Sequence, residues 1–178
     1  MSPYPDEPND PDGYRSVADL LERPPVPINW NLLDAEQAEI EWHDLDQWVK
    51  WLKNTFGLPP NIVPPYWHRH DELVWELSAL HCHWLSCYHE SASPSAPISW
   101  MRDFAEARSR LRDWVSICGT RLDRDRPTRQ TTWPGDLPAD EGGEIEIRDR
   151  NKDFVEFIRE DVLRRRRIEA IANQELIG

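Results

Sequence analysis

Apolar residues recur at helical spacing in three consecutive stretches of this chain. The first stretch runs from Asp34, a suitable N-cap, to Phe56, and Gly57 followed by two prolines ends it. Its apolar stripe consists of Ala38, Trp42, Leu45, Val49, Leu52 and Phe56. The pattern predicts a first core helix over these residues.

Two further stripes predict two more helices. One helix begins between Pro65 and Asp71 and runs to about His89, and the other runs from about Ile98 to Cys118. Their stripes are Leu73, Leu77, Leu80, Trp84 and Tyr88 in the first, and Trp100, Phe104, Ala107, Leu111, Trp114, Val115 and Cys118 in the second. Because each helix has one apolar stripe and the connections are short, the sequence predicts an antiparallel three-helix bundle.

The chain changes character after Gly119. Residues 120–147 are polar and show no periodicity, so we expect a linker, and residues 144–147 alternate but are too few to predict a strand. Residues 148–174 favour a helix, with a rough apolar face. That face carries Phe154, Phe157, Ile158, Ile168 and Ala172. The predicted fold is all-α, with the three-helix bundle as core and a long C-terminal helix added to it.

The first residues differ in composition from the rest. Residues 1–27 are rich in Pro, Asp and Glu, which predicts a disordered acidic arm. A chain of 178 residues is about the size of one domain. We therefore expect one helical core domain over residues 28–119, which the linker joins to the Arg-rich helix over residues 148–174.

Charge is distributed unevenly along the chain, whose formal net charge is −12. Residues 1–100 carry 5 Lys and Arg against 16 Asp and Glu, whereas residues 101–178 carry 16 against 17. This excess of negative charge argues against general attraction to nucleic acid or to an anionic membrane surface. Local contacts through the arginines of the second half are still compatible with it.

The chain shows no hydrophobic signal segment after Met1 and no apolar run near the length of a membrane span. Its three cysteines are an odd number, and Cys82 and Cys87 would point about 140° apart on a helix. We therefore expect a cytoplasmic protein with reduced thiols and no membrane association.

Five of the six histidines lie between Pro64 and Glu90. On a helix, only His83 and Cys87 are four residues apart, the spacing at which two side chains can share a metal ion. Glu76 and Glu90 lie close to the same stripe. His83 and Cys87 are weak metal candidates, because the chain has no Cys-x-x-Cys or His-x-x-x-His partner elsewhere. Neither a nucleophile motif nor a glycine-rich phosphate loop is present, so the sequence predicts no catalytic residue and no cofactor. A metal-dependent enzyme using His83 and Cys87 is kept as an alternative.

Two sets of residues could bind a partner. Apolar side chains lie away from the main stripes of the first two helices, and either another part of the chain or a second protein molecule should cover them. These partner-binding candidates are Ile40, Trp51, Trp75 and Cys82. Nucleic-acid candidates are Arg159, Arg164, Arg165, Arg166 and Arg167. Consecutive arginines point all round a helix, however, so pairing with neighbouring carboxylates is the simpler interpretation.

One further pattern consists of Trp30, Trp42, Trp48, Val49, Trp51, Leu52, Pro64, Pro65, Trp67, His70, Glu76, Leu77, Ala79, Leu80, Trp100, Arg110, Leu111 and Trp114. Through these residues, the stretch 28–130 resembles a family of small uncharacterised actinobacterial proteins, often encoded near plasmid or integrative-element genes. Tyr66, and Cys118 followed by Asp125, stand where members of the family often have Cys or a Cys–His pair. If those positions form a metal knot in the family, this chain lacks it.

The preferred interpretation is a non-enzymatic accessory protein that acts through protein contacts, including self-association. The resemblance implies a link to a mobile genetic element. The first alternative is a DNA-associated regulator that uses the arginine cluster of the C-terminal helix.

Overall fold

The computed structural model describes residues 26–137 and 142–177, so residues 1–25 of the expected arm lie outside the described ranges. The described part is mostly helical. Its elements are α2 (Ala35–Phe56), the 3₁₀ turn η1 (Trp67–Arg69), α3 (Asp71–Cys87), α4 (Ala96–Ile117), β1 (Arg124–Asp125), β2 (Ile145–Glu146) and α5 (Arg150–Ile177). No helix in these ranges is long and apolar enough to span a membrane.

Local sequence signals set the ends of α2 as expected. The Asp34 carboxylate accepts a hydrogen bond from the Gln37 backbone N–H at 2.7 Å, and the Gln37 side chain accepts one from the Asp34 N–H at 3.1 Å. This reciprocal pair is a capping box. At the other end Gly57 adopts φ +59°, a left-handed conformation that ends the helix.

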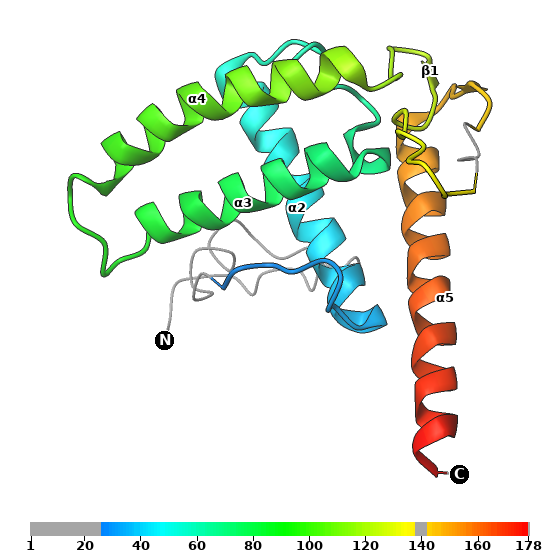
Figure 1. Ribbon diagram of the computed structural model, residues 1–178. Helices are drawn as coiled ribbons and strands as arrows, with labels where there is room; N and C mark the ends of the chain where they lie inside the picture. The colour runs from blue at the N-terminus through cyan, green and yellow to red at the C-terminus, as the bar shows by residue number, and fades with distance from the viewer. Residues whose placement is uncertain (1–25, 138–141, 178) are drawn as a thin grey trace, which may run out of the picture.

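The helices pack in two antiparallel pairs. The helices α3 and α4 form one hairpin, and α5 runs antiparallel to α2 as the second pair (Figure 1). The expected bundle is therefore only partly correct, because α2 crosses the α3–α4 hairpin instead of lying parallel to it. The aromatic side chain of Phe56, at the end of α2, reaches Trp100 and Phe104 of α4 with ring centroids 5.8 and 4.8 Å apart.

One hydrophobic core connects all four helices. Trp42, Leu77 and Leu111 are buried in the same cluster, together with Phe154 and other residues of α5. Some expected core positions face solvent instead: Tyr88, Trp114 and Ile168 are 43%, 39% and 55% exposed. Trp114 lies about 60° from Leu111 around the helix axis, at the edge of the stripe that faces α3.

The segment expected to be a linker returns to the core at both ends. Residues Arg124 and Asp125 pair with Glu146 and Ile145 in a two-residue antiparallel ladder. Asp125 and the neighbouring Ile147 are buried, at 3% and 7% exposure. This ladder places the start of α5 beside η1, where the polar contacts described next converge.

Candidate functional site

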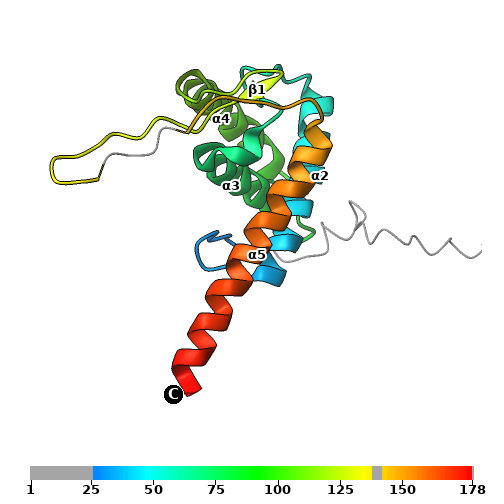
Figure 2. The same cartoon turned by 90° about the vertical axis from the view of Figure 1, so that its right-hand side faces the viewer.

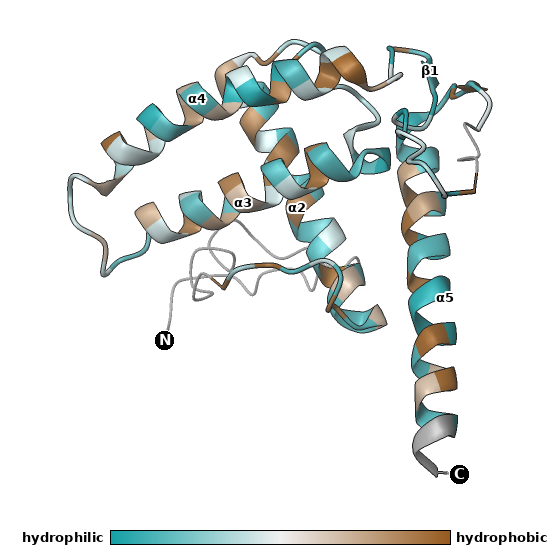
Figure 3. Ribbon diagram, viewed as in Figure 1, coloured by the Kyte–Doolittle hydropathy of each residue, from teal (hydrophilic) through white to brown (hydrophobic). Residues whose placement is uncertain are grey.

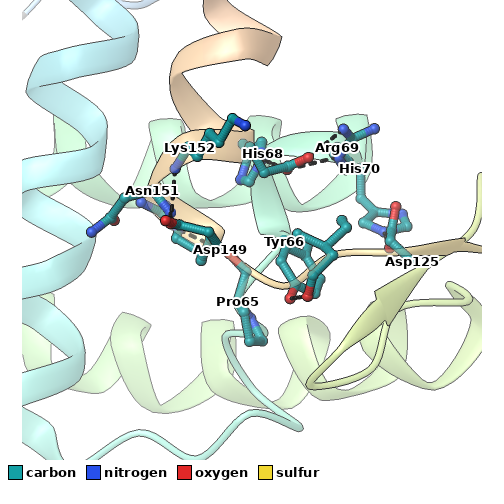
Figure 4. Close-up of polar contacts among 12 residues, drawn as sticks. Pro65, Tyr66, His68, Arg69, His70, Asp125, Asp149, Asn151 and Lys152 are labelled. Carbon is teal, nitrogen blue, oxygen red and sulfur yellow. Dashed lines mark hydrogen bonds and ion pairs between the residues drawn. The ribbon is translucent and has the colours of Figure 1, made fainter.

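We name the turn at residues 66–70 the hub. Its side chains hydrogen-bond to β1 and to the start of α5 and so hold both against the core (Figure 4). His68 Nε2 lies 2.9 Å from Asp153 Oδ2 on α5. The Arg69 guanidinium donates to both oxygens of the same carboxylate, at 2.6 and 2.9 Å. One carboxylate near the start of α5 therefore receives three hydrogen bonds from two consecutive residues.

His70 holds strand β1 through the same kind of contact, a hydrogen bond between an imidazole and a carboxylate. Its Nε2 lies 2.8 Å from Asp125 Oδ1 and its Nδ1 lies 2.8 Å from the Thr128 hydroxyl. That hydroxyl donates in turn to Glu72 at 2.6 Å. Figure 4 shows that His68 and His70 project from the hub towards different partners, so alternate residues of one turn hold two different segments.

The Tyr66 side chain hydrogen-bonds to the backbone beside β1 and beside β2. Its hydroxyl lies 3.0 Å from the carbonyl oxygens of both Leu122 and Ile147, which flank the two strands. Tyr66 itself is 2% exposed. Tyr66 is therefore a buried phenol that donates to backbone carbonyls.

Burial shapes the electrostatics of the hub. Burial lowers the pKa of His68 and outweighs the hydrogen bond to Asp153, which acts in the opposite direction. Burial alone would raise the pKa of Asp153, but the hydrogen bonds from His68 and Arg69 hold it well below its usual range. The contact therefore joins a neutral imidazole N–H to an ionised carboxylate.

The Asp125–His70–Thr128 arrangement contains the groups of a catalytic triad but not its geometry. In a triad the hydroxyl donates its proton to the imidazole, whereas the Thr128 hydroxyl donates to Glu72. The His70 side chain is also 0% exposed. We conclude that the hub residues hold β1 and α5 against the core and do not activate a nucleophile.

The metal candidates are neighbours, as their spacing predicts. His83 Nδ1 lies 3.6 Å from Cys87 Sγ, and His83 Nε2 lies 2.9 Å from Asp103 Oδ2 on α4. Burial and the nearby Asp103 carboxylate raise the pKa of the Cys87 thiol, so it is not an activated thiolate. Within residues 26–137 and 142–177, no group of three His, Cys, Asp or Glu side chains has an arrangement that could hold a metal ion.

The arginine cluster of α5 has mixed roles. Arg164 and Arg165 both pair with Asp161, and Arg165 also donates to the Leu33 carbonyl oxygen at 2.7 Å. The Arg166 guanidinium lies 4.0 Å from Glu39 on α2. In the described part of the chain, Arg159 and Arg167 are exposed and have no carboxylate within ion-pair distance. The cluster thus divides into anchoring arginines and two that face solvent.

Three of the four partner-binding candidates are partly covered by their own chain. Trp51 packs on Trp84 of α3, with centroids 5.0 Å apart. Cys82 donates to the Val26 carbonyl at 3.4 Å, and Ile40 lines a recess with residues 26–28. Trp75 differs from them, because 39% of it is exposed.

Trp75 borders a recess between α3, α5 and the segment before α2. The recess encloses about 360 Å³, near the lower limit of small-ligand sites. Its aromatic walls are Trp30, Trp42, Trp75 and Phe157, and its charged residues are Asp71, Glu160, Asp161, Arg164 and Arg165. We call this feature the Trp75 recess. Sequence reasoning identified Trp75 but could not join it to α5, since no local signal shows which helices pack together.

The helix α5 extends beyond the recess and past the start of α2 (Figures 1 and 2). Near this end of α5, the Glu169 carboxylate accepts a hydrogen bond from the Ala35 N–H of α2 at 2.6 Å. Leu163, Ile168 and Ile171 are 43%, 55% and 57% exposed. Figure 3 shows hydrophobic bands continuing along this lower part of α5. An apolar, partly unpartnered helix end therefore adjoins the Trp75 recess.

Comparison with known proteins yields no relative: no family model, no curated protein and no solved structure matches this chain.

Proposed function

We propose that this protein is a non-enzymatic accessory protein that acts by binding another protein molecule through the Trp75 recess and the adjoining end of α5. The observation that carries the proposal is the exposure of Trp75 at the recess. Ile168 and Ile171, further along α5 than the residues that line the recess, are exposed as well. Exposed apolar groups of this size often mark binding surfaces, and tryptophan is enriched among residues that dominate binding energy. The hub supports this interpretation, because its two imidazoles are buried and hydrogen-bonded to carboxylates of α5 and β1.

The proposed role on a mobile genetic element rests on the resemblance of residues 28–130 to the actinobacterial family. The recess and α5 provide a surface through which such an accessory protein would join a larger assembly. Self-association is one form of this function, in which the second molecule is another copy of the same chain.

Site-specific photo-cross-linking in cells of the source organism tests the proposal. A photoreactive phenylalanine analogue would replace Trp75 or Ile168, and a control would replace Arg112, an exposed residue of α4. We expect one identical protein to be captured from positions 75 and 168 and not from position 112. Absence of adducts at both positions, or equal capture from position 112, would contradict the proposal.

A DNA-associated regulator is the second candidate, favoured by the exposed Arg159 and Arg167. Electrophoretic mobility shift at low and moderate salt separates the two functions. Salt-sensitive DNA binding that Arg159→Glu and Arg167→Glu together abolish would favour the regulator.

The metal-dependent enzyme is tested by elemental analysis. Stoichiometric metal that the substitution His83→Ala removes would favour this function.

A further inference from the structure

The aromatic walls of the Trp75 recess offer ring faces and no free indole donors at their two buried tryptophans. Trp30 Nε1 donates to the Ser78 hydroxyl at 3.0 Å, and Trp42 Nε1 donates to Asp161 Oδ2 at 3.1 Å. The rings lie against each other with centroids 4.4 Å apart. A ligand in the recess therefore meets the rings of these indoles and not their N–H donors, together with the exposed indole of Trp75.

Some charged side chains of the recess are paired with one another, and others are not. Asp161 accepts hydrogen bonds from Trp42, Arg164 and Arg165, so both arginines of the recess are already paired. Within the ranges that the structure describes, the carboxylates of Asp71 and Glu160 accept no hydrogen bond and lie in no ion pair, although Glu160 is near enough to Arg69 to help raise the pKa of its guanidinium. The recess thus contains indole rings together with two carboxylates that accept no hydrogen bond from a described residue.

Carboxylates beside indole faces favour a cation that also carries an apolar body. Arginine and lysine side chains have this chemistry, since their charged groups are attracted by aromatic faces and by carboxylates while their methylene chains pack on the rings. The chain already makes such contacts internally: the guanidinium carbons of Arg69, Arg108 and Arg150 lie 5.7, 5.3 and 4.6 Å from phenylalanine ring centroids.

We propose that the Trp75 recess binds an arginine or lysine side chain presented by a basic segment of a partner protein. The inference rests on the proposed function and deepens it by naming the chemistry of the partner. The net charge of −12 would attract a basic partner and would repel a second copy of the chain. An anionic ligand would instead have to separate Arg164 and Arg165 from Asp161.

Titration of the full chain with short peptides tests the inference. The probes are acetyl-Gly-Arg-Gly-amide, acetyl-Gly-Lys-Gly-amide and a neutral peptide in which citrulline replaces arginine, followed through the NMR signal of the Trp75 indole N–H. We expect saturable shifts with both cationic peptides and affinity about tenfold weaker for citrulline. Inorganic phosphate, the anionic probe, should cause no saturable shift.

A matched pair of variants separates local from general charge effects. Asp71→Asn with Glu160→Gln should weaken binding of the cationic peptides about tenfold. Glu144→Gln with Glu146→Gln removes the same charge from exposed residues near β2 and should leave binding unchanged. The other indole N–H signals report whether each variant keeps the fold. Equal binding of the citrulline peptide, equal loss in both variants, or saturable binding of phosphate alone would overturn the inference.

Cross-linking distinguishes failure of this inference from failure of the proposed function. If Asp71→Asn with Glu160→Gln leaves the adduct from position 168 undiminished, the partner binds but the cationic side chain is not what the recess recognises. If the adduct proves to be a second copy of the chain, the basic-partner inference is also overturned while the interaction function stands. If the unsubstituted recess yields no adduct at all, the proposed function itself fails.

Discussion

The imidazole of His70 and the carboxylate of Asp125 lie 2.8 Å apart although 55 residues separate them in the chain. Both residues are buried, at 1% and 3% exposure. Their contact fixes strand β1 against the start of α3 and, through the β1–β2 ladder, helps to place the first turn of α5.

Replacement of His70 by Phe tests this contact. The substitution leaves the buried Asp125 carboxylate without its imidazole partner, so we expect the free energy of unfolding to fall by about 3 kcal/mol. Urea denaturation followed by circular dichroism measures the change. His89→Gln, near the surface beyond α3, should cost less than about 0.5 kcal/mol. Equal costs for the two substitutions would show that the His70 contact does not fasten the strand.

His68 should make stability depend on pH. Its pKa in the folded protein is lowered from the ordinary 6.5 by burial, so its stabilising contribution is complete above pH 6.5 and is lost as pH falls through the lowered value. We expect the free energy of unfolding to decrease between pH 7 and pH 5. His68→Gln keeps an N–H donor for Asp153 without a titrating ring, and should flatten this decrease. An unchanged pH profile in the variant would argue against the assignment.

The carboxylate of Asp161 should control the second half of α5. Asp161→Asn weakens the hydrogen bond from Trp42 that joins α5 to α2. It also weakens the bonds within α5 from Arg164 and Arg165, and Arg165 in turn contacts the Leu33 carbonyl oxygen. We expect amide hydrogen exchange over residues 162–174 to accelerate about tenfold, while α3 and α4 keep their protection. Glu156→Gln, on an exposed position of α5, is the matched control. Acceleration throughout the molecule would indicate global destabilisation instead of local release.

The left-handed Gly57 at the end of α2 offers a simple test of backbone geometry. Gly57→Ala adds a Cβ at φ +59°, although no neighbouring atom would obstruct it. We expect a loss of about 1 kcal/mol, caused by the backbone conformation alone. Gly143→Ala is the control, since its Cβ also meets open space and its φ is not left-handed. Thermal denaturation should show a lower midpoint for the first variant only.

Local signals predicted the helices well because they operate within a few residues. The N-cap at Asp34, the stop at Gly57 and the stripe containing Trp42 needed no information from elsewhere in the chain. The direction in which α2 crosses the α3–α4 hairpin was not predictable in this way, because an apolar stripe shows which face is buried but not the angle at which a neighbour lies.

The hydrogen bonds of the hub could not be predicted from the sequence for a related reason. His68 and His70 were visible as histidines near a helix start, but their partners Asp153 and Asp125 lie 85 and 55 residues away. Nothing within one sequence distinguishes a carboxylate that returns to the core from one that faces solvent. The same limit applies to the Trp75 recess, whose walls come from α2, the segment before it, α3 and α5.

Hydroxyl-radical footprinting of the protein, purified and inside cells of the source organism, tests the central claim most directly. In the purified protein, Trp75, Ile168 and Ile171 should be oxidised readily, as should the exposed Trp133 (68%). We expect Trp75, Ile168 and Ile171 to become protected in cells while Trp133 stays reactive, because a bound partner covers the recess and the end of α5. Equal oxidation of Trp75, Ile168 and Ile171 in both settings would contradict a role in protein binding at this surface.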